Sequence, residues 1–230
     1  FVDRSVRHGG RASLRMEDLG RTHPPSGNGR VYKRLTVRTF SHHHLRVWVR
    51  TEGFEGGEVR ALVLGQAPSR TLQWNSIPVR PTQDWTAFDV TFNSLTHDQV
   101  AVYLGVWGGR KGRIWWDDAL LEPAGPVNLV RRPGAPLQAR LADGTELVEG
   151  QDLARVEDPR SGRNPWPGNF DLWHAPPEIV PLPGGRLREG DRLILDYYHT
   201  ALIYGGQVSA SLLEPASLEI VREQMRSLRR

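Results

Sequence analysis

Short segments in which apolar and polar residues alternate recur through the first half of the chain, and they constrain the fold more than any other feature. In residues 85–92 (WTAFDVTF), Phe88, Val90 and Phe92 fall on one side of an extended strand and the residues between them fall on the other. The same alternation runs through RVYKRLTVRTF, HHLRVWVRTE, EVRALVLG, QVAVYLGVWGG and RIWWDDALLEP. Turn residues are plentiful, since the chain has 24 Gly and 17 Pro. The pattern predicts an all-β fold that begins with a β-sandwich.

A break in this pattern at residues 122–128 (EPAGPVN) marks the expected end of the sandwich. A chain of 230 residues is long enough for two domains. We therefore predict a first domain at 1–123 and a second, small β-sandwich-like domain at 124–213. Within the second domain, the Asp143-Gly144 pair lies between extended stretches and predicts a hairpin.

The last segment, 214–230, differs in kind from the rest. Leu218, Val221, Met225 and Leu228 recur at helical spacing, which predicts one C-terminal helix. Because no helix stop signal follows, we expect this helix to begin a third domain that the chain does not contain. The chain starts at Phe1 rather than at a methionine, so we expect a mature or excised piece of a longer protein.

Composition excludes several classes of partner and site. Lys and Arg number 30 against 26 Asp and Glu, but the arginines are spread along the chain and no nucleic-acid motif accompanies them, so nucleic acid is not an expected partner. The absence of cysteine excludes disulfides and Cys-ligated zinc. No run is long and apolar enough for a signal peptide or a membrane helix, so no membrane partner is expected either.

The segment 99–109 (QVAVYLGVWGG) suggests a binding face. Alternation places Val100, Val102, Leu104 and Val106 in the core and turns Tyr103, Gly105 and Trp107 outward together. Aromatic rings beside a glycine on an outward strand face are suited to stacking on a flat ligand. The alternative is that a loop covers them.

Four segments, taken in order, resemble the jelly-roll carbohydrate-binding modules of secreted polysaccharide-degrading enzymes. These are GGRASLRMED, HLRVWVRTE, DWTAFDVTFNSL and GRIWWDDALLEP, and the resemblance covers about residues 5–123. It implies a jelly-roll sandwich, a polysaccharide or oligosaccharide ligand, and a secreted or periplasmic bacterial location. The second segment is similar to the β domain that links such a module to a glycoside-hydrolase-like barrel, and this implies the missing C-terminal domain as a further partner.

Sugar recognition needs flat apolar faces and planar polar groups. A tryptophan in a sandwich belongs to the core about twice as often as not, and in GRIWWDDALLEP we expect Trp116 to be core and Trp115 to be more exposed. The candidate carbohydrate-binding residues are Trp74, Tyr103, Trp107, Trp115, Arg46, Arg50 and Asp89, with Gln73 as a further hydrogen-bonding group.

The resemblance also implies a structural calcium, for which Asp117 with Glu17 or Asp18 are the candidate ligands. Surface salt bridges to nearby arginines are an equally good interpretation of these carboxylates. Asp117 and Asp118 are adjacent on a strand, so we expect them to point to opposite faces and not to form a catalytic pair. The three histidines of SHHHLRVW cannot all converge on one transition metal for the same reason.

No phosphate loop, nucleophile elbow or zinc-hydrolase motif occurs, so catalysis within these residues is not expected, although the full-length parent is expected to be a glycoside hydrolase. The favoured hypothesis is a noncatalytic carbohydrate-binding fragment. The alternatives are a structural or adhesive module that packs on neighbouring domains or chains, and a wall of the parent's active site. The loop containing Trp166, Phe170, Trp173 and His174 is predicted to dock against the missing domain.

Overall fold

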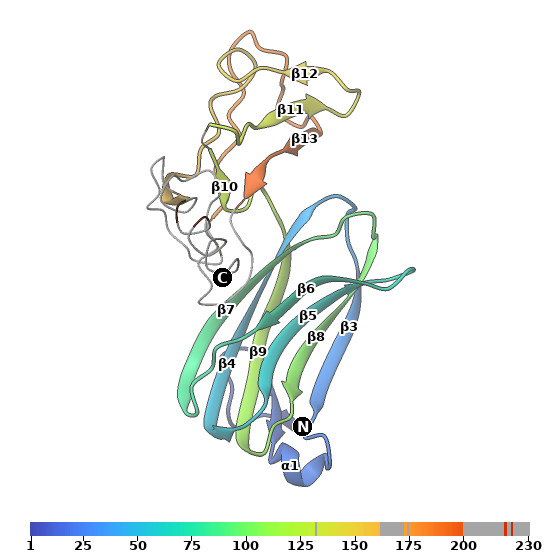
Figure 1. Ribbon diagram of the computed structural model, residues 1–230, viewed down its shortest axis with the longest axis vertical. Coiled ribbons are helices and arrows are strands. Elements are labelled where there is room, and N and C mark those ends of the chain that lie inside the picture. Colours follow the sequence, from blue (N-terminus) through green and yellow to red (C-terminus); the bar gives the residue numbers. More distant parts are fainter. Residues whose placement is uncertain (132, 162–172, 174, 200–218, 220–221, 223–230) are drawn as a thin grey trace.

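The computed structural model describes residues 1–131, 133–161, 173, 175–199, 219 and 222, and their regular secondary structure consists mostly of β-strands. One antiparallel sheet has five strands in the order β1-β2-β9-β4-β7, of which Figure 1 labels β4, β7 and β9. They are β1 (Val2–Asp3), β2 (Ser13–Glu17), β9 (Lys111–Ala124), β4 (His42–Glu55) and β7 (Gln83–Asn93). A single turn of helix, α1 (Leu19–Thr22), follows β2.

The second sheet of the sandwich has four antiparallel strands in the order β3-β8-β5-β6. They are β3 (Gly29–Thr36), β8 (Gln99–Trp107), β5 (Glu58–Gly65) and β6 (Arg70–Ser76). The strand β5 has the same bounds as the alternating segment EVRALVLG. The segment that forms β6 was not among the predicted strands.

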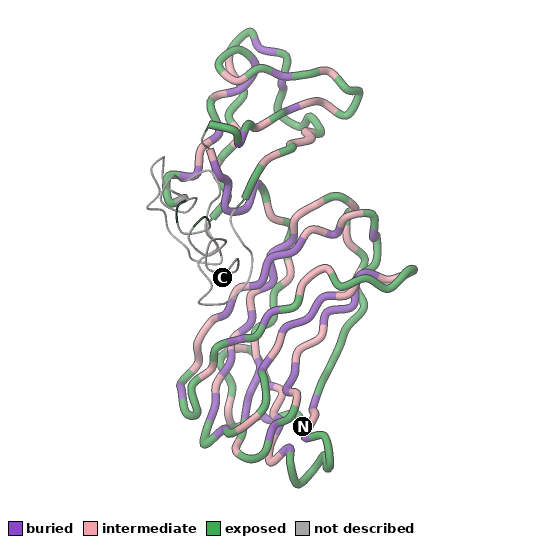
Figure 2. The backbone as a smooth tube through the Cα atoms, in the orientation of Figure 1, coloured by how far each residue is buried: buried purple, intermediate pink, exposed green. Residues whose placement is uncertain are grey.

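The hydrophobic core lies between these two sheets. Val47, Val90 and Trp116 from the five-stranded sheet pack with Val63 and Val106 from the four-stranded sheet, and all five are buried. Figure 2 shows buried residues alternating with accessible ones along the strands. The prediction of an all-β sandwich is therefore confirmed, including its assignment of Phe88, Val90 and Phe92 to the core.

A β-bulge interrupts the alternation of β9. Trp48 pairs with Asp117 and Arg46 with Leu120, so two residues of β9 stand opposite one residue of β4. Asp118 has φ +44°, a left-handed conformation that aspartate tolerates better than most residues. Beyond the bulge the faces exchange: Leu121 packs on the core and Leu120 is 52% exposed. Uninterrupted alternation would place Leu120 on the same face as Trp116, and the bulge is the reason that it does not.

The second part of the chain forms two small sheets. In one, β10 (Leu129–Val130) pairs with β14 (Tyr198–His199); in the other, β11 (Gln138–Leu141) lies between β12 (Glu146–Leu147) and β13 (Leu193–Asp196). A short 3-10 turn, η1, spans Pro159–Ser161. The predicted hairpin is present, with Gly144 at φ +92° between β11 and β12.

Apolar residues of this second part form a separate cluster around Leu129, Leu147 and Leu153. The domain boundaries at 123 and 213 stay predictions.

The predicted C-terminal helix lies almost wholly outside the described residues. Within 214–230 the structure describes only Glu219 and Arg222, which are exposed and form an ion pair of 3.3 Å. Among the described residues, no helix combines the length and apolar character needed to cross a membrane.

Histidines at the start of β4 join the sandwich to the second part of the chain. The Tyr197 hydroxyl lies 3.0 Å from Nδ1 of His42 and accepts the Val127 backbone N–H at 3.0 Å. The His44 ring stacks on Trp173 with centroids 3.8 Å apart. The described residue of the aromatic loop thus docks on the sandwich, whereas docking on a missing domain was predicted; Trp166, Phe170 and His174 lie outside the described residues.

Candidate functional site

The outer face of the four-stranded sheet carries a row of large side chains that crosses all of its strands. Tyr32 on β3 pairs with Tyr103 on β8, Tyr103 pairs with Leu62 on β5, and Leu62 pairs with Trp74 on β6. Residues paired in register lie on the same face, and the neighbours of Leu62 along β5, Ala61 and Val63, point into the core. Three strand spacings of about 4.8 Å give the row a length of about 14 Å.

The two ends of this row are open to solvent. Tyr32 is 56% exposed and Trp74 is 48% exposed, whereas Leu62 between them is buried. The rings of Tyr32 and Tyr103 stack, with centroids 5.0 Å apart and planes inclined by 22°. The row therefore presents flat aromatic surface to solvent on a rigid sheet, which the core does not require for its own packing.

Arginine side chains lie over two tryptophan rings of this face, Trp74 and Trp107. Arg30 and Arg60 pair with Gly105 from either side of β8. The guanidinium carbon of Arg60 lies 4.7 Å from the centroid of the Trp74 ring and 5.6 Å from that of Trp107, and the guanidinium carbon of Arg30 lies 5.4 Å from the Trp107 centroid. These are cation–π distances. Arg60 therefore bridges Trp74 and Trp107, and Arg30 contacts Trp107.

Gly105 gives Arg30 its place on the sheet. A Cβ atom at position 105 would approach Cγ of Arg30 to 2.8 Å and the carbonyl oxygen of Gly29 to 2.5 Å, both closer than real contacts allow. The absent side chain lets Arg30 lie across β8 toward Trp107. Gly105 was predicted to lie on the outward face of its strand, and the close approach of Arg30 explains why a glycine occupies this position.

Polar groups border the aromatic surface at the end of β5. The Arg60 Nε donates to Oε2 of Glu58 at 2.6 Å, and the Ser76 hydroxyl donates to the same oxygen at 3.3 Å. Glu58 and Ser76 also line a shallow cavity of about 310 Å³ that lies beside them. The face thus combines exposed rings, fixed cations and a hydrogen-bonding edge.

The predicted carbohydrate-binding residues do not form one site, because they lie on opposite faces of the sandwich. Trp74, Tyr103 and Trp107 belong to the face just described. Arg46, Arg50, Asp89 and Trp115 lie on the outer face of the five-stranded sheet.

The polar groups on that second face bind one another. The Nε of Arg46 donates to Oδ1 of Asp89 at 2.7 Å, and Nε2 of His44 lies 2.7 Å from the same oxygen. Burial raises the pKa of Asp89, but the hydrogen bonds from His44 and Arg46 outweigh it and hold the pKa below its usual value. Arg50 lies over the Trp115 ring at 5.8 Å and 3.9 Å from Asp84. These groups hold the sheet face together.

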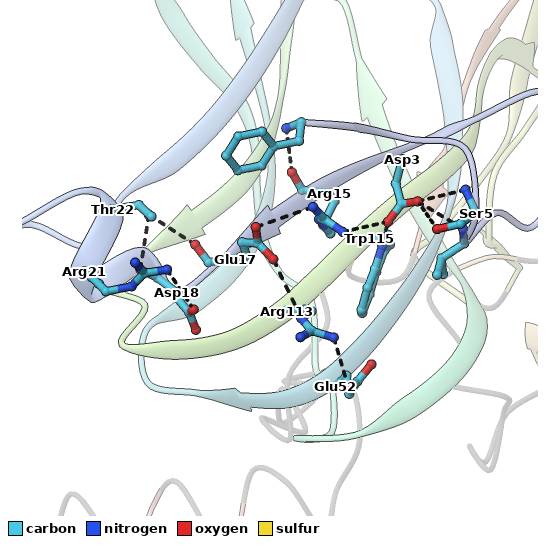
Figure 3. Close-up of polar contacts among 12 residues, drawn as sticks. Asp3, Ser5, Arg15, Glu17, Asp18, Arg21, Thr22, Glu52, Arg113 and Trp115 are labelled. Atoms are coloured by element: carbon cyan, nitrogen blue, oxygen red, sulfur yellow. Dashed lines mark hydrogen bonds and ion pairs between the residues drawn. The ribbon is translucent and has the colours of Figure 1, made fainter.

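Trp115 is buried, so its predicted exposure is wrong. The side chain points out of the core as expected, but the N-terminal segment covers it and leaves it 1% exposed (Figure 3). Its Nε1 donates to Oδ2 of Asp3 at 3.0 Å, and Nη1 of Arg15 donates to the same oxygen at 3.1 Å. The hydrogen bonds from Trp115 and then Ser5 hold the pKa of Asp3 well below its usual range. Trp116 is core, as predicted.

The two aspartates after Trp116 fasten the N-terminal segment to β9. Oδ2 of Asp117 accepts the backbone N–H of His8 at 2.7 Å and that of Gly9 at 3.3 Å. Oδ2 of Asp118 lies 2.7 Å from Nδ1 of His8, whose ring stacks on Trp48 at 3.9 Å. The expectation that the two carboxylates point to opposite faces is wrong, because the bulge at Asp118 turns both toward this loop.

These residues do not fit a calcium site built from Asp117 and Glu17. Glu17 pairs with Arg113, four residues along β9 from Asp117, and lies 3.7 Å from Nε of Arg113 and 3.5 Å from Nη2 of Arg15 (Figure 3). Asp18 is ion-paired with Arg21 at 3.3 Å. In the described part of the chain, no group of three or more His, Cys, Asp or Glu side chains converges as metal ligands would.

Tyr32, Arg30 and Arg60 were missing from the predicted site. Tyr32 lies in the alternating segment RVYKRLTVRTF, and the alternation places it on the same face as Arg30. What the sequence does not show is the pairing of β3 with β8, which brings Tyr32 beside Tyr103. Arg60 depends in the same way on the pairing of β5 with β8.

No protein-family model matches the chain, and no curated protein is similar to it in sequence. Among solved structures, a family 4 carbohydrate-binding module is 13% identical with a TM-score of 0.36, matching 41% of this chain and 60% of its own. A family 16 carbohydrate-binding module is 12% identical with a TM-score of 0.41; the match covers 53% of this chain and 83% of the module. The K1 cleaved adhesin domain of Lys-gingipain from Porphyromonas gingivalis W83 is 12% identical with a TM-score of 0.36; the match covers 54% of this chain and 83% of that domain. The function proposed below rests on the geometry of the face.

Proposed function

We propose that the chain binds a polysaccharide on the outer face of the four-stranded sheet by aromatic stacking. The observation that supports this is the row formed by Tyr32, Tyr103 and Trp74, whose ends are exposed. A pyranose ring has an apolar face of C–H groups, which packs against an aromatic ring. Because the row crosses four adjacent strands and both of its ends are exposed, it suits successive sugar residues of a glycan chain.

Hydrogen bonds to the sugar hydroxyls come, in this proposal, from the groups that border the row. Arg30 and Arg60 are held by Trp107 and Trp74, and Glu58 and Ser76 lie at the edge. Prepositioned polar groups give orientation and specificity at small cost in side-chain entropy. Trp107 supports these cations, which is a different role from the stacking that the sequence predicted for it.

The proposed binding is noncatalytic. Hydrolysis of a glycosidic bond needs a pair of carboxyl groups on either side of the bond. On this face the structure places Glu58, which already accepts hydrogen bonds from Arg60 and Ser76. In the proposal the chain belongs to a secreted or periplasmic bacterial protein that degrades polysaccharide, and it supplies that protein with affinity for its substrate.

The test is a titration of the protein with soluble xylan, β-glucan, galactan and polygalacturonate, followed by tryptophan fluorescence and calorimetry, together with a pull-down on insoluble cellulose. Since Trp74 is exposed, a bound glycan is expected to shift the tryptophan emission and to reduce the quenching of that emission by added iodide. Saturable binding of one class of glycan would support the proposal. A folded protein that binds none of them would contradict it.

A second candidate function is packing on neighbouring domains. It is favoured by the contacts of His42 with Tyr197 and of His44 with Trp173, which already join the sandwich to the second part of the chain. These contacts use the start of β4, an interior strand of the five-stranded sheet, and the aromatic row lies on the other sheet. Tryptophan emission that changes with protein concentration but stays the same when any of the glycans is added would favour this second function.

A further inference from the structure

The charge of the aromatic face suggests which class of glycan it binds, an inference that rests on the function proposed above. Strand alternation puts Arg30 and Arg34 on the same face as Tyr32, one on each side of it along β3. Arg60 lies on this face two strands away, and the acidic residue there is Glu58. The face therefore carries three cations and one anion.

Two of these cations have no carboxylate to neutralise them. Arg60 is ion-paired with Glu58, but neither Arg30 nor Arg34 has an ion pair with any described residue. Both are exposed, and Arg30 is held over the Trp107 ring at 5.4 Å. By contrast, the arginines on the opposite face are paired: Arg46 with Asp89, and Arg50 with Asp84.

A guanidinium group binds a carboxylate or a sulfate through two parallel N–H donors, which a neutral hydroxyl matches poorly. Arg30 and Arg34 are four residues apart on β3 and are thus separated by about 13 Å along the strand. Tyr32 offers its ring between them. The two arginines thus flank the aromatic row at Tyr32, so a glycan chain that follows the row can stack on Tyr32 while anionic groups on its two sides reach them.

We propose that the ligand of this face is an anionic polysaccharide, one whose sugars carry carboxylate or sulfate groups. A neutral glycan would stack on the same rings but would leave both arginines without a counter-charge. Binding is then expected to weaken as salt rises, because the Debye length falls from about 10 Å at 0.1 M to about 3 Å at 1 M salt.

The test compares polygalacturonate with its fully methyl-esterified form, which keeps the sugar chain and removes the charge. Dextran sulfate and dextran provide the corresponding pair for sulfate. The variant is Arg30→Gln/Arg34→Gln. The matched control is Arg21→Gln/Arg155→Gln, which removes the same two charges at exposed sites outside the face.

Wild-type protein is expected to bind an anionic polymer at least about five-fold more tightly than its neutral partner, from two exposed charge contacts. The face variant should lose this preference and the control should keep it. Preference for dextran sulfate over polygalacturonate would support the inference and identify sulfate as the group. Equal or tighter binding of the neutral polymers would overturn the inference and leave the proposed function intact, whereas no binding of any polymer would overturn both.

Discussion

Acidification should weaken the contact between the sandwich and the second part of the chain through His42. Burial, followed by the charges of His199 and His43, lowers the pKa of His42 from 6.5 to about 4. The unfolded chain binds a proton near pH 6.5, whereas the folded protein resists it until about pH 4. The free energy of unfolding is therefore at its full value above pH 6.5 and decreases as the pH falls through this window.

The size of the effect follows from the two pKa values. Their difference of about 2.5 pH units, at about 1.36 kcal/mol per unit, gives a loss of about 3 kcal/mol by pH 4. In the protonated ring both nitrogens are donors, so the Tyr197 hydroxyl, 3.0 Å from Nδ1, cannot donate to it. A His42→Gln variant cannot titrate, so its stability relative to wild type should rise by about this amount between pH 6.5 and pH 4.

Urea unfolding followed by tryptophan fluorescence, at several pH values across this range, measures the difference. A His23→Gln variant serves as the control, because His23 is exposed at the end of α1 and far from this contact. If wild type, His42→Gln and His23→Gln lose stability in parallel on acidification, the assignment of the effect to His42 is refuted.

Three further predictions concern the segment around β9. Replacing Trp116 by Phe should cost less than about 1.5 kcal/mol of unfolding free energy, because its buried N–H has no acceptor among the described residues. Trp115→Phe should cost more, because it removes the donor to Asp3; urea unfolding gives the order of the two losses, and the reverse order would contradict this prediction. Asp118→Val should destabilise the protein by about 1–3 kcal/mol in thermal unfolding, because a β-branched residue is strained at φ +44°, and Asp118→Asn should be mild; equal effects would argue against the bulge. A calcium chelator should leave the melting temperature unchanged, because backbone N–H groups already satisfy Asp117; a fall that added calcium reverses would show that a metal is bound.

The sandwich was predictable from local pattern, because a strand with one buried face must alternate. The core positions Phe88, Val90 and Phe92 follow from this, as do the bounds of β5. The pattern failed where the backbone departs from regular geometry. The bulge at Asp118 exchanged the faces of β9. A further register shift gives β6 one extra residue, Leu72, opposite the step from Val63 to Leu64 on β5, and this disturbs the alternation of β6.

The site was less predictable because it depends on contacts between distant segments. Alternation correctly turned Trp115 away from the core, but its burial comes from Asp3, more than one hundred residues earlier in the chain. Likewise, no local sequence pattern shows that Trp74 and Arg46 lie on different sheets, on opposite outer faces of the sandwich. Only the strand order β3-β8-β5-β6 brings Tyr32, Tyr103 and Trp74 into one row.

The most direct test of the proposed function compares Trp74→Ala with Trp85→Ala in a titration with the best-bound polysaccharide. Trp74 ends the aromatic row, and Trp85 lies on the other sheet, where its ring meets His8 at 5.8 Å. Loss of one stacking ring is worth about 1.5 kcal/mol, so Trp74→Ala should raise Kd by about ten-fold while Trp85→Ala leaves it unchanged. Unchanged binding by Trp74→Ala, with the loss falling on Trp85→Ala instead, would place the glycan on the five-stranded sheet and contradict the proposal.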